Sequence, residues 1–123
     1  MKILLAIGTG SFIGGIFRYL LSQSVQARFL SAFPFGTITV NVAGCFLIGI
    51  VLGLSDRNGI PHEWRLFLAT GLLGGFTTFS AFSSETINLI RDGQVMYASL
   101  YTVITVVAGL LATYIGYSIL KLI

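Results

Sequence analysis

Four long apolar segments constrain the fold of this chain more than any other feature of its sequence. A helix needs about 20 apolar residues to cross a hydrocarbon layer about 30 Å thick, and all four segments are long enough. Only 9% of the residues are charged, whereas about a quarter are charged in soluble domains. We therefore predict an all-α, multi-pass membrane protein that forms a single domain over residues 1–123. The predicted spans cover approximately residues 3–21, 33–54, 65–90 and 95–120.

The distribution of positive charge leaves the orientation of these spans open. An even number of spans places both termini on one side, and Lys and Arg near the span ends normally decide which side is cytoplasmic. Two explanations fit a nearly even count: noise in a small protein, or insertion in both directions with pairing of inverted copies about an axis in the membrane plane. The terminal side would carry Lys2, Arg57, Arg65 and Lys121, and the opposite side Arg18, Arg28 and Arg91.

Glycines are spaced along the spans in a way that favours close helix packing. Small residues four positions apart let membrane helices approach one another closely, although glycine is also simply common in such helices. Four helices leave little interior in which to place polar groups, so we also expect self-association. The pairs with this spacing are Gly10 with Gly14, Gly49 with Gly53, and Gly71 with Gly75.

The third span contains the unusual stretch GGFTTFSAF at residues 74–82. Two adjacent glycines and two β-branched threonines weaken a helix locally. A break at membrane depth would release backbone carbonyls, which need partners inside the protein or an ion. Broken helices in transport proteins coordinate cations in this way. We predict a break here, the alternative being an unbroken helix with a close-packing site.

Polar and aromatic residues recur inside the spans. The amide of Asn41 must find a partner in hydrocarbon, either a neighbouring helix or a passing ligand. Phe79 and Phe82 share a helix face, which Ser83 and Thr86 extend by a turn. Because an aromatic ring has a positive edge, such rings can touch an anion without holding it as tightly as a full charge would.

The fourth span repeats this combination of hydroxyls and rings. Tyr97, Tyr101 and Thr105 follow one another at helical spacing, whereas Glu85 lies toward one end of its span. The predicted interior therefore offers hydrogen-bond donors and ring edges, with no carboxylate at its centre. A path of this kind suits a small, strongly hydrated anion, because hydroxyls replace its water and weak, repeated sites let it leave.

Several function classes find no support in the sequence. The net charge of +3 comes from scattered residues, so there is no basic patch to bind nucleic acid. The single Cys45 and the single His62 belong to no group with metal-ligand spacing. No Ser, His and acid pattern suggests nucleophilic catalysis. We predict that the chain is not an enzyme.

Three motifs together resemble a known family. They are GGIFRY at residues 14–19, NVAGCF at residues 41–46 and GGFTTFSAF at residues 74–82. In this order they are similar to the small bacterial fluoride channels, the Fluc or CrcB family, over essentially the whole chain. The resemblance implies an antiparallel, dual-topology homodimer in the lipid of the bacterial cytoplasmic (inner) membrane. It also implies passive, fluoride-selective conduction out of the cell, which reduces fluoride toxicity.

The resemblance further implies roles for individual residues. The ring edges of Phe79 and Phe82 would meet fluoride, with the amide of Asn41 turned toward them. Backbone carbonyls of Gly74 and Thr77, from both subunits, would hold a structural Na⁺. The remaining assignments are Arg18 near the vestibule, and Ser83, Thr86, Tyr101 and Thr105 along the fluoride pathway, where Gly109 takes the turn at which another hydroxyl is expected.

Two rival functions remain open at this point. A small multidrug-resistance-type, proton-coupled exporter would share the length, the four spans and the inverted dimer. It requires a titratable carboxylate at mid-membrane, yet the first span has no acid and Glu85 is off-centre. A non-transporting assembly subunit would explain the glycines, but it gives no use for Asn41 beside paired phenylalanines.

Overall fold

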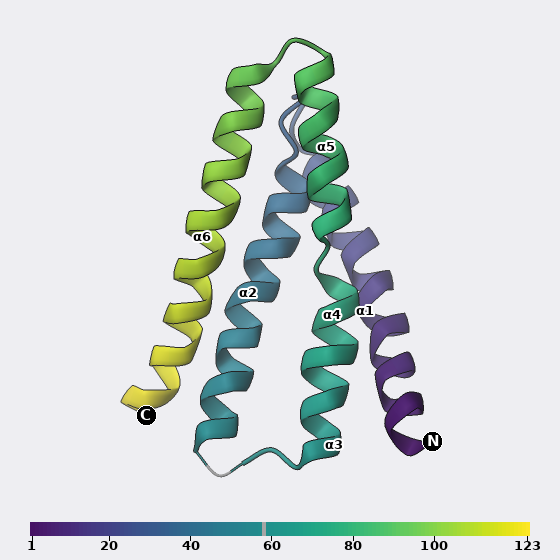
Figure 1. Ribbon diagram of the computed structural model, residues 1–123, viewed down its shortest axis with the longest axis vertical. Coiled ribbons are helices and arrows are strands. Elements are labelled where there is room, and N and C mark those ends of the chain that lie inside the picture. Colours follow the sequence, from purple (N-terminus) through teal and green to yellow (C-terminus); the bar gives the residue numbers. More distant parts are fainter. Residues whose placement is uncertain (58) are drawn as a thin grey trace.

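The chain folds into four rods of helix that stand side by side (Figure 1). The computed structural model describes residues 1–57 and 59–123. Within these ranges, all four rods are long and apolar enough to cross a membrane, which confirms the predicted multi-pass architecture. Three rods are single helices, α1 (Lys2–Gln26), α2 (Phe35–Asp56) and α6 (Val95–Leu122), and the remaining rod consists of α3 (His62–Arg65), η1 (Leu66–Leu73), α4 (Gly74–Phe76) and α5 (Phe79–Arg91).

The helices extend beyond the predicted apolar ranges, most clearly at the end of α1. Its last turns contain Ser22 and Ser24, whose hydroxyls donate to the carbonyls of Tyr19 and Leu20 at 3.2 and 2.7 Å. Such back-bonding gives each hydroxyl a partner within its own helix. Hydropathy marks the apolar part of a span and therefore misses a polar extension of this kind.

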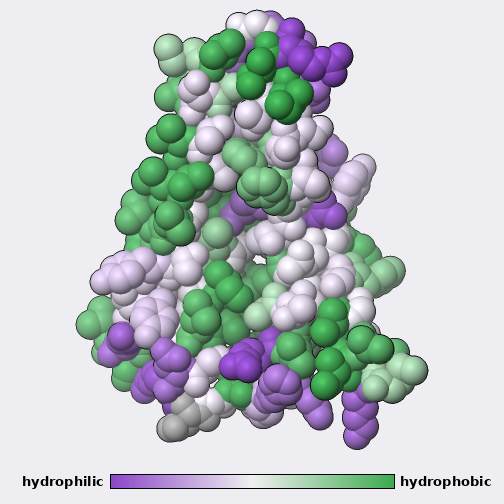
Figure 2. Space-filling model, viewed as in Figure 1, coloured by the Kyte–Doolittle hydropathy of each residue, from purple (hydrophilic) through white to green (hydrophobic). Residues whose placement is uncertain are grey.

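Both chain termini lie at one end of the bundle, as an even number of spans requires (Figure 1). The α2–α3 connection lies at that same end, whereas the α1–α2 and α5–α6 connections lie at the other. Hydrophobic residues cover much of the surface in Figure 2, and the most hydrophilic residues gather mainly toward its two ends. This distribution fits a protein whose middle section faces lipid.

Glycines lie where the rods cross most closely. Gly10 and Gly14 bring α1 against η1, since a Cβ at Gly10 would lie 2.7 Å from the Leu72 nitrogen and one at Gly14 would overlap the Leu72 carbonyl oxygen. Gly49 brings α2 against α6 in the same way, because a Cβ there would overlap the Thr113 carbonyl oxygen. The predicted use of the glycine pairs in helix packing is confirmed.

A small aromatic core joins the α1–α2 connection to α5 and α6. The buried residues Phe33, Leu89, Ala98 and Tyr101 form it, and Phe82 packs against them. Phe33 reaches this position because the side-chain amide of Gln26 donates to its carbonyl at 3.2 Å. The ring of Phe33 then meets the ring of Tyr101 edge-on, with 5.8 Å between centroids. The core therefore holds Tyr101 and Phe82 in place toward the end of the bundle where the α1–α2 and α5–α6 connections lie.

Candidate functional site

The third rod is broken at Thr77 and Thr78, inside the GGFTTFSAF stretch. Thr77 has φ −86° and ψ 159°, and Thr78 has φ −151° and ψ 117°, so both are extended. The predicted break is therefore present, but Gly74 and Gly75 remain helical within α4. The break occurs at the two β-branched threonines, since their side chains favour extended backbone. Gly75 instead allows α1 to approach, because a Cβ there would lie 2.6 Å from the Ser11 carbonyl oxygen.

The segment before the break is also irregular. Leu66–Leu73 forms a π-helix, in which hydrogen bonds run from residue i to i+5 and the turns are wider than in an α-helix. Apolar periodicity predicted an ordinary helix here. A π-helix is rare and often accompanies functional sites, but its apolar sequence carries no local signal for it.

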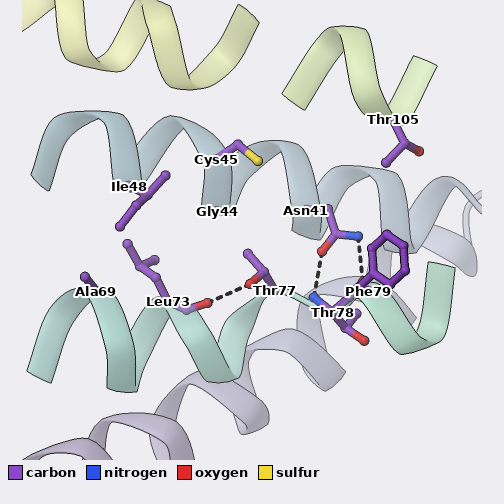
Figure 3. A pocket seen from close by; sticks show the side chains of 10 residues that line it. All are labelled: Asn41, Gly44, Cys45, Ile48, Ala69, Leu73, Thr77, Thr78, Phe79 and Thr105. Carbon is purple, nitrogen blue, oxygen red and sulfur yellow. Dashed lines mark hydrogen bonds between the residues drawn. The ribbon is translucent and has the colours of Figure 1, made fainter. Parts of the chain in front are cut away.

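The side chain of Asn41 binds the backbone of the break from the neighbouring helix α2. Its Nδ2 donates to the Thr78 carbonyl at 3.0 Å, and its Oδ1 accepts from the Thr78 N–H at 2.8 Å (Figure 3). One amide thus satisfies both backbone groups of a residue that has left the helix. Because an amide nitrogen carries two hydrogens, one further N–H remains for the adjoining pocket.

Three more side chains stabilise the broken ends. Thr78 Oγ1 accepts from the Ala81 N–H at 3.1 Å and so caps the start of α5. Thr77 Oγ1 donates to the Leu73 carbonyl at 3.0 Å. Arg18 Nε donates from α1 to the Gly75 carbonyl at 3.2 Å. A cation at the end of α4 is favourable, because the carbonyl end of a helix carries partial negative charge.

The break removes the helical partners of several carbonyls, among them those of Gly74 and Thr77. In a continuous helix, the carbonyls of Gly74 and Thr77 would accept from the N–H groups of Thr78 and Ala81. Those two N–H groups instead donate to Asn41 Oδ1 and to Thr78 Oγ1. The break therefore releases the carbonyls of Gly74 and Thr77 at membrane depth.

A pocket of about 330 Å³ lies beside the break, between α2, the third rod and α6. Figure 3 shows Asn41 on one wall, Thr77, Thr78 and Phe79 on another, and Thr105 on α6. The Thr105 hydroxyl is buried and has no hydrogen-bond partner among the described residues. None of the lining residues carries a charge, and most of the lining is apolar, so the few neutral donors and the ring of Phe79 stand out within it.

Three aromatic rings lead from this pocket into the core. Phe79 is 78% exposed, and its ring centroid lies 5.4 Å from that of Phe82. Phe82 in turn lies 5.1 Å from the buried ring of Tyr101. The Tyr101 hydroxyl donates to Glu85 Oε1 at 3.2 Å, and the Thr37 hydroxyl donates to Glu85 Oε2 at 3.0 Å. The row of rings therefore ends at a carboxylate that two hydroxyls hold.

Comparison with known proteins identifies the family. The family model described as "CrcB-like protein, Camphor Resistance (CrcB)" matches residues 5–117, which is most of the chain. The chain belongs to the CrcB family. This result confirms the resemblance that the three motifs indicated and does not favour the proton-coupled exporter.

Curated relatives of this CrcB chain are named as channels, not as enzymes. "Fluoride-specific ion channel FluC" of Chlorobium phaeobacteroides (strain BS1) is 45% identical over 120 residues, which cover 97% of this chain and 93% of the relative. The protein of the same name from Prosthecochloris aestuarii is 43% identical over 118 residues, covering 95% and 91%. That from Flavobacterium psychrophilum is 41% identical over 122 residues, covering 98% of each.

Most of the predicted pathway residues of this CrcB chain lie in the pocket or in the row of rings beside it, whereas Ser83 and Thr86 lie in neither. Asn41, Thr77, Phe79 and Thr105 line one pocket, and Phe82 and Tyr101 continue from Phe79 toward the core. Ser83 is exposed, and the Thr86 hydroxyl donates to the Phe82 carbonyl of its own helix at 2.7 Å.

Sequence reasoning missed two contacts, that of Arg18 with the break and the pairing of Thr37 with Glu85. The position of Thr37, one helical turn before Asn41 on α2, was the available signal for the second.

Proposed function

We propose that the chain is a fluoride-selective ion channel of the bacterial cytoplasmic membrane, through which fluoride leaves the cell passively. Fluoride crosses lipid as the neutral acid from acidic surroundings and ionises inside, where the anion is trapped. A channel lets that anion return down its gradient without coupling to another ion. The observation that carries the proposal is an uncharged, largely apolar pocket at the broken helix of a CrcB-family chain, to which Asn41 and Thr105 contribute hydrogen-bond donors.

The chemistry of the pocket supports selectivity for a small anion. The free N–H of Asn41 and the unpaired hydroxyl of Thr105 can each donate to fluoride in place of water. The positive edge of Phe79 adds weak attraction in the pocket, and that of Phe82, whose ring lies next to it, does so beyond the pocket. Because no charged side chain lines the pocket, each contact stays weak enough for the ion to move on.

We further propose that two inverted copies form the conducting unit. The pocket is open on the side of Phe79, whose large apolar ring is 78% exposed beside the neutral donors. A second copy would cover that ring and close the wall of the pathway. The nearly even distribution of Lys and Arg between the two ends of the bundle allows insertion in both orientations, which an antiparallel pair requires.

A structural Na⁺ at the break is part of this proposal. The released carbonyls of Gly74 and Thr77 are hard oxygen donors of the type that coordinate small cations through broken helices. The same two carbonyls of the inverted copy would complete the set. A bound Na⁺ would supply positive charge that satisfies the carbonyls and ties the two copies together at their broken helices.

Fluoride efflux from liposomes tests the channel. Vesicles loaded with potassium fluoride or potassium chloride should release fluoride rapidly after valinomycin is added, while chloride is retained. Equal passage of both ions, or of neither, would contradict the proposal. Phe82→Ile removes a ring whose positive edge attracts the ion, so it should slow fluoride release by about tenfold, which corresponds to about 1.4 kcal/mol of added barrier. The same substitution at the exposed Phe12 of α1 should leave the release unchanged.

Cysteine labelling tests the inverted arrangement. In a Cys45→Ser background, Asp92→Cys and Glu63→Cys place single thiols at exposed positions on opposite ends of the bundle. A membrane-impermeant maleimide added to intact spheroplasts should label about half of each variant, since an antiparallel pair presents both ends to each side. Complete labelling of one variant and none of the other would mean a single orientation.

Thermal unfolding tests the cation site. Purified dimer should unfold at a higher temperature in sodium chloride than in potassium chloride or N-methyl-D-glucamine chloride, because a ligand that binds only the folded state stabilises it. Elemental analysis after desalting should find one sodium ion per dimer. Identical unfolding temperatures in the three salts, together with no retained sodium, would remove Na⁺ from the proposal.

A further inference from the structure

Gly44 on α2 lies directly against the break. It is buried one turn beyond Asn41, and a Cβ added there would overlap the Thr77 Cγ2 methyl and lie 3.3 Å from the Phe76 ring. The space that a side chain at position 44 would fill is therefore occupied by the methyl group of Thr77. Figure 3 shows Thr77 next to Gly44 on the neighbouring helix, and both residues line the pocket.

The Thr77 side chain is fixed from two directions. Its methyl lies against Gly44, and its hydroxyl donates to the Leu73 carbonyl at 3.0 Å. A β-branched side chain has few staggered positions, so turning the methyl away from Gly44 would also withdraw the hydroxyl from Leu73. This side chain sits on the residue whose extended ψ of 159° ends α4.

We infer that Gly44 and the Thr77 methyl form a steric lock that positions the Thr77 carbonyl for the pathway and its cation. Gly44 is a positioning residue, because it acts through Thr77 and contacts no ion. Helix α2 thus fixes two consecutive residues of the break. The amide of Asn41 binds the backbone of Thr78, and the space left by the glycine at position 44 holds the methyl group of Thr77. The inference rests on the proposed channel function and adds to it the element that sets the geometry of the break.

A complementary pair of substitutions tests the lock. Gly44→Ala adds a methyl where the Thr77 methyl already lies, and Thr77→Ser removes that methyl while it keeps the hydroxyl. We expect Gly44→Ala to lower fluoride flux by about tenfold or more. In the double variant with Thr77→Ser, the flux should recover to within about threefold of that of Thr77→Ser alone. Neighbouring residues typically couple by amounts of this size.

A matched control separates this contact from general packing. Thr113→Ser, on α6, also removes one threonine methyl beside α2 and keeps its hydroxyl, which donates to the Cys45 carbonyl at 3.0 Å. Gly44→Ala combined with Thr113→Ser should stay as impaired as Gly44→Ala. If Gly44→Ala alone gives little folded protein, Thr77→Ser should restore the yield and Thr113→Ser should not.

The second readout is the stabilisation by sodium, which needs no flux. Gly44→Ala should lose the difference in unfolding temperature between sodium and potassium chloride, and the pair with Thr77→Ser should regain it. Unchanged flux and sodium response in Gly44→Ala, or equal rescue by both serine substitutions, would overturn the lock. Wild-type flux is measured first, so a failure of the channel function appears there, whereas a failure of the lock appears only in the variants.

Discussion

Asn41→Ala is expected to abolish most fluoride conduction and to destabilise the folded protein. The substitution leaves the N–H and the carbonyl of Thr78 without the two hydrogen bonds that Asn41 provides. Each unsatisfied buried polar group costs about 1–3 kcal/mol. The two together would cost about 2–6 kcal/mol, with the lower part of that range applying because Asn41 is only partly buried.

Asn41→Asp separates the two functions of this amide. A carboxylate can still accept from the Thr78 N–H, but it cannot donate to the Thr78 carbonyl. It also places a negative charge at the pocket, where it repels an anion. We therefore expect Asn41→Asp to conduct fluoride no better than Asn41→Ala, although it keeps one of the two hydrogen bonds to Thr78.

The measurements are unfolding temperature in detergent and fluoride release from liposomes. Asn88→Ala provides a control, because Asn88 is exposed on α5 and surface substitutions usually change stability by less than about 0.5 kcal/mol. Wild-type stability and flux in Asn41→Ala would show that the hydrogen bonds between Asn41 and Thr78 hold neither the break nor the pathway.

The global architecture follows from features that a sequence displays directly. Hydropathy gives the four spans, and parity of the spans places both termini at one end. Glycine spacing predicts that helices cross closely, because only residues without a Cβ permit it, but only the structure shows that α1 crosses η1 and α2 crosses α6. The combination of glycines and threonines in GGFTTFSAF predicts that the helix breaks there. The isolated amide of Asn41 indicates that a polar group inside the bundle needs a partner.

The details of the break depend on contacts between distant residues. The glycines were candidates to break the helix, but Gly75 is held in α4 by its packing against Ser11, so the break falls on Thr77 and Thr78. Arg18 near the end of its span gave no indication that it would reach the Gly75 carbonyl. The carboxylate of Glu85 pairs with Thr37 and Tyr101 only because α2, α5 and α6 meet there. Local composition cannot encode which face of one helix meets another.

Gly14→Ala is expected to cause a second large loss of stability, for a steric reason. An added Cβ would overlap the Leu72 carbonyl oxygen and lie 2.9 Å from the Phe76 nitrogen. Both atoms belong to the backbone, so no side-chain rotation can relieve the overlap. Overpacking of this kind typically costs about 1–3 kcal/mol, and the helices must separate where Ser11 and Arg18 hydrogen-bond to Gly71 and Gly75.

The neighbouring glycine supplies the matched control. A Cβ at Gly15 would meet no heavy atom within 4 Å, and alanine favours a helix over glycine by about 0.5–1 kcal/mol. Thermal unfolding should therefore place Gly14→Ala well below the wild type and Gly15→Ala at or above it. Equal losses in both variants would mean that helix propensity or lipid contact, and not the crossing of α1 with η1, decides the effect. A selective loss in Gly14→Ala, accompanied by slower fluoride release, would tie that crossing to the Arg18 contact that supports the broken helix.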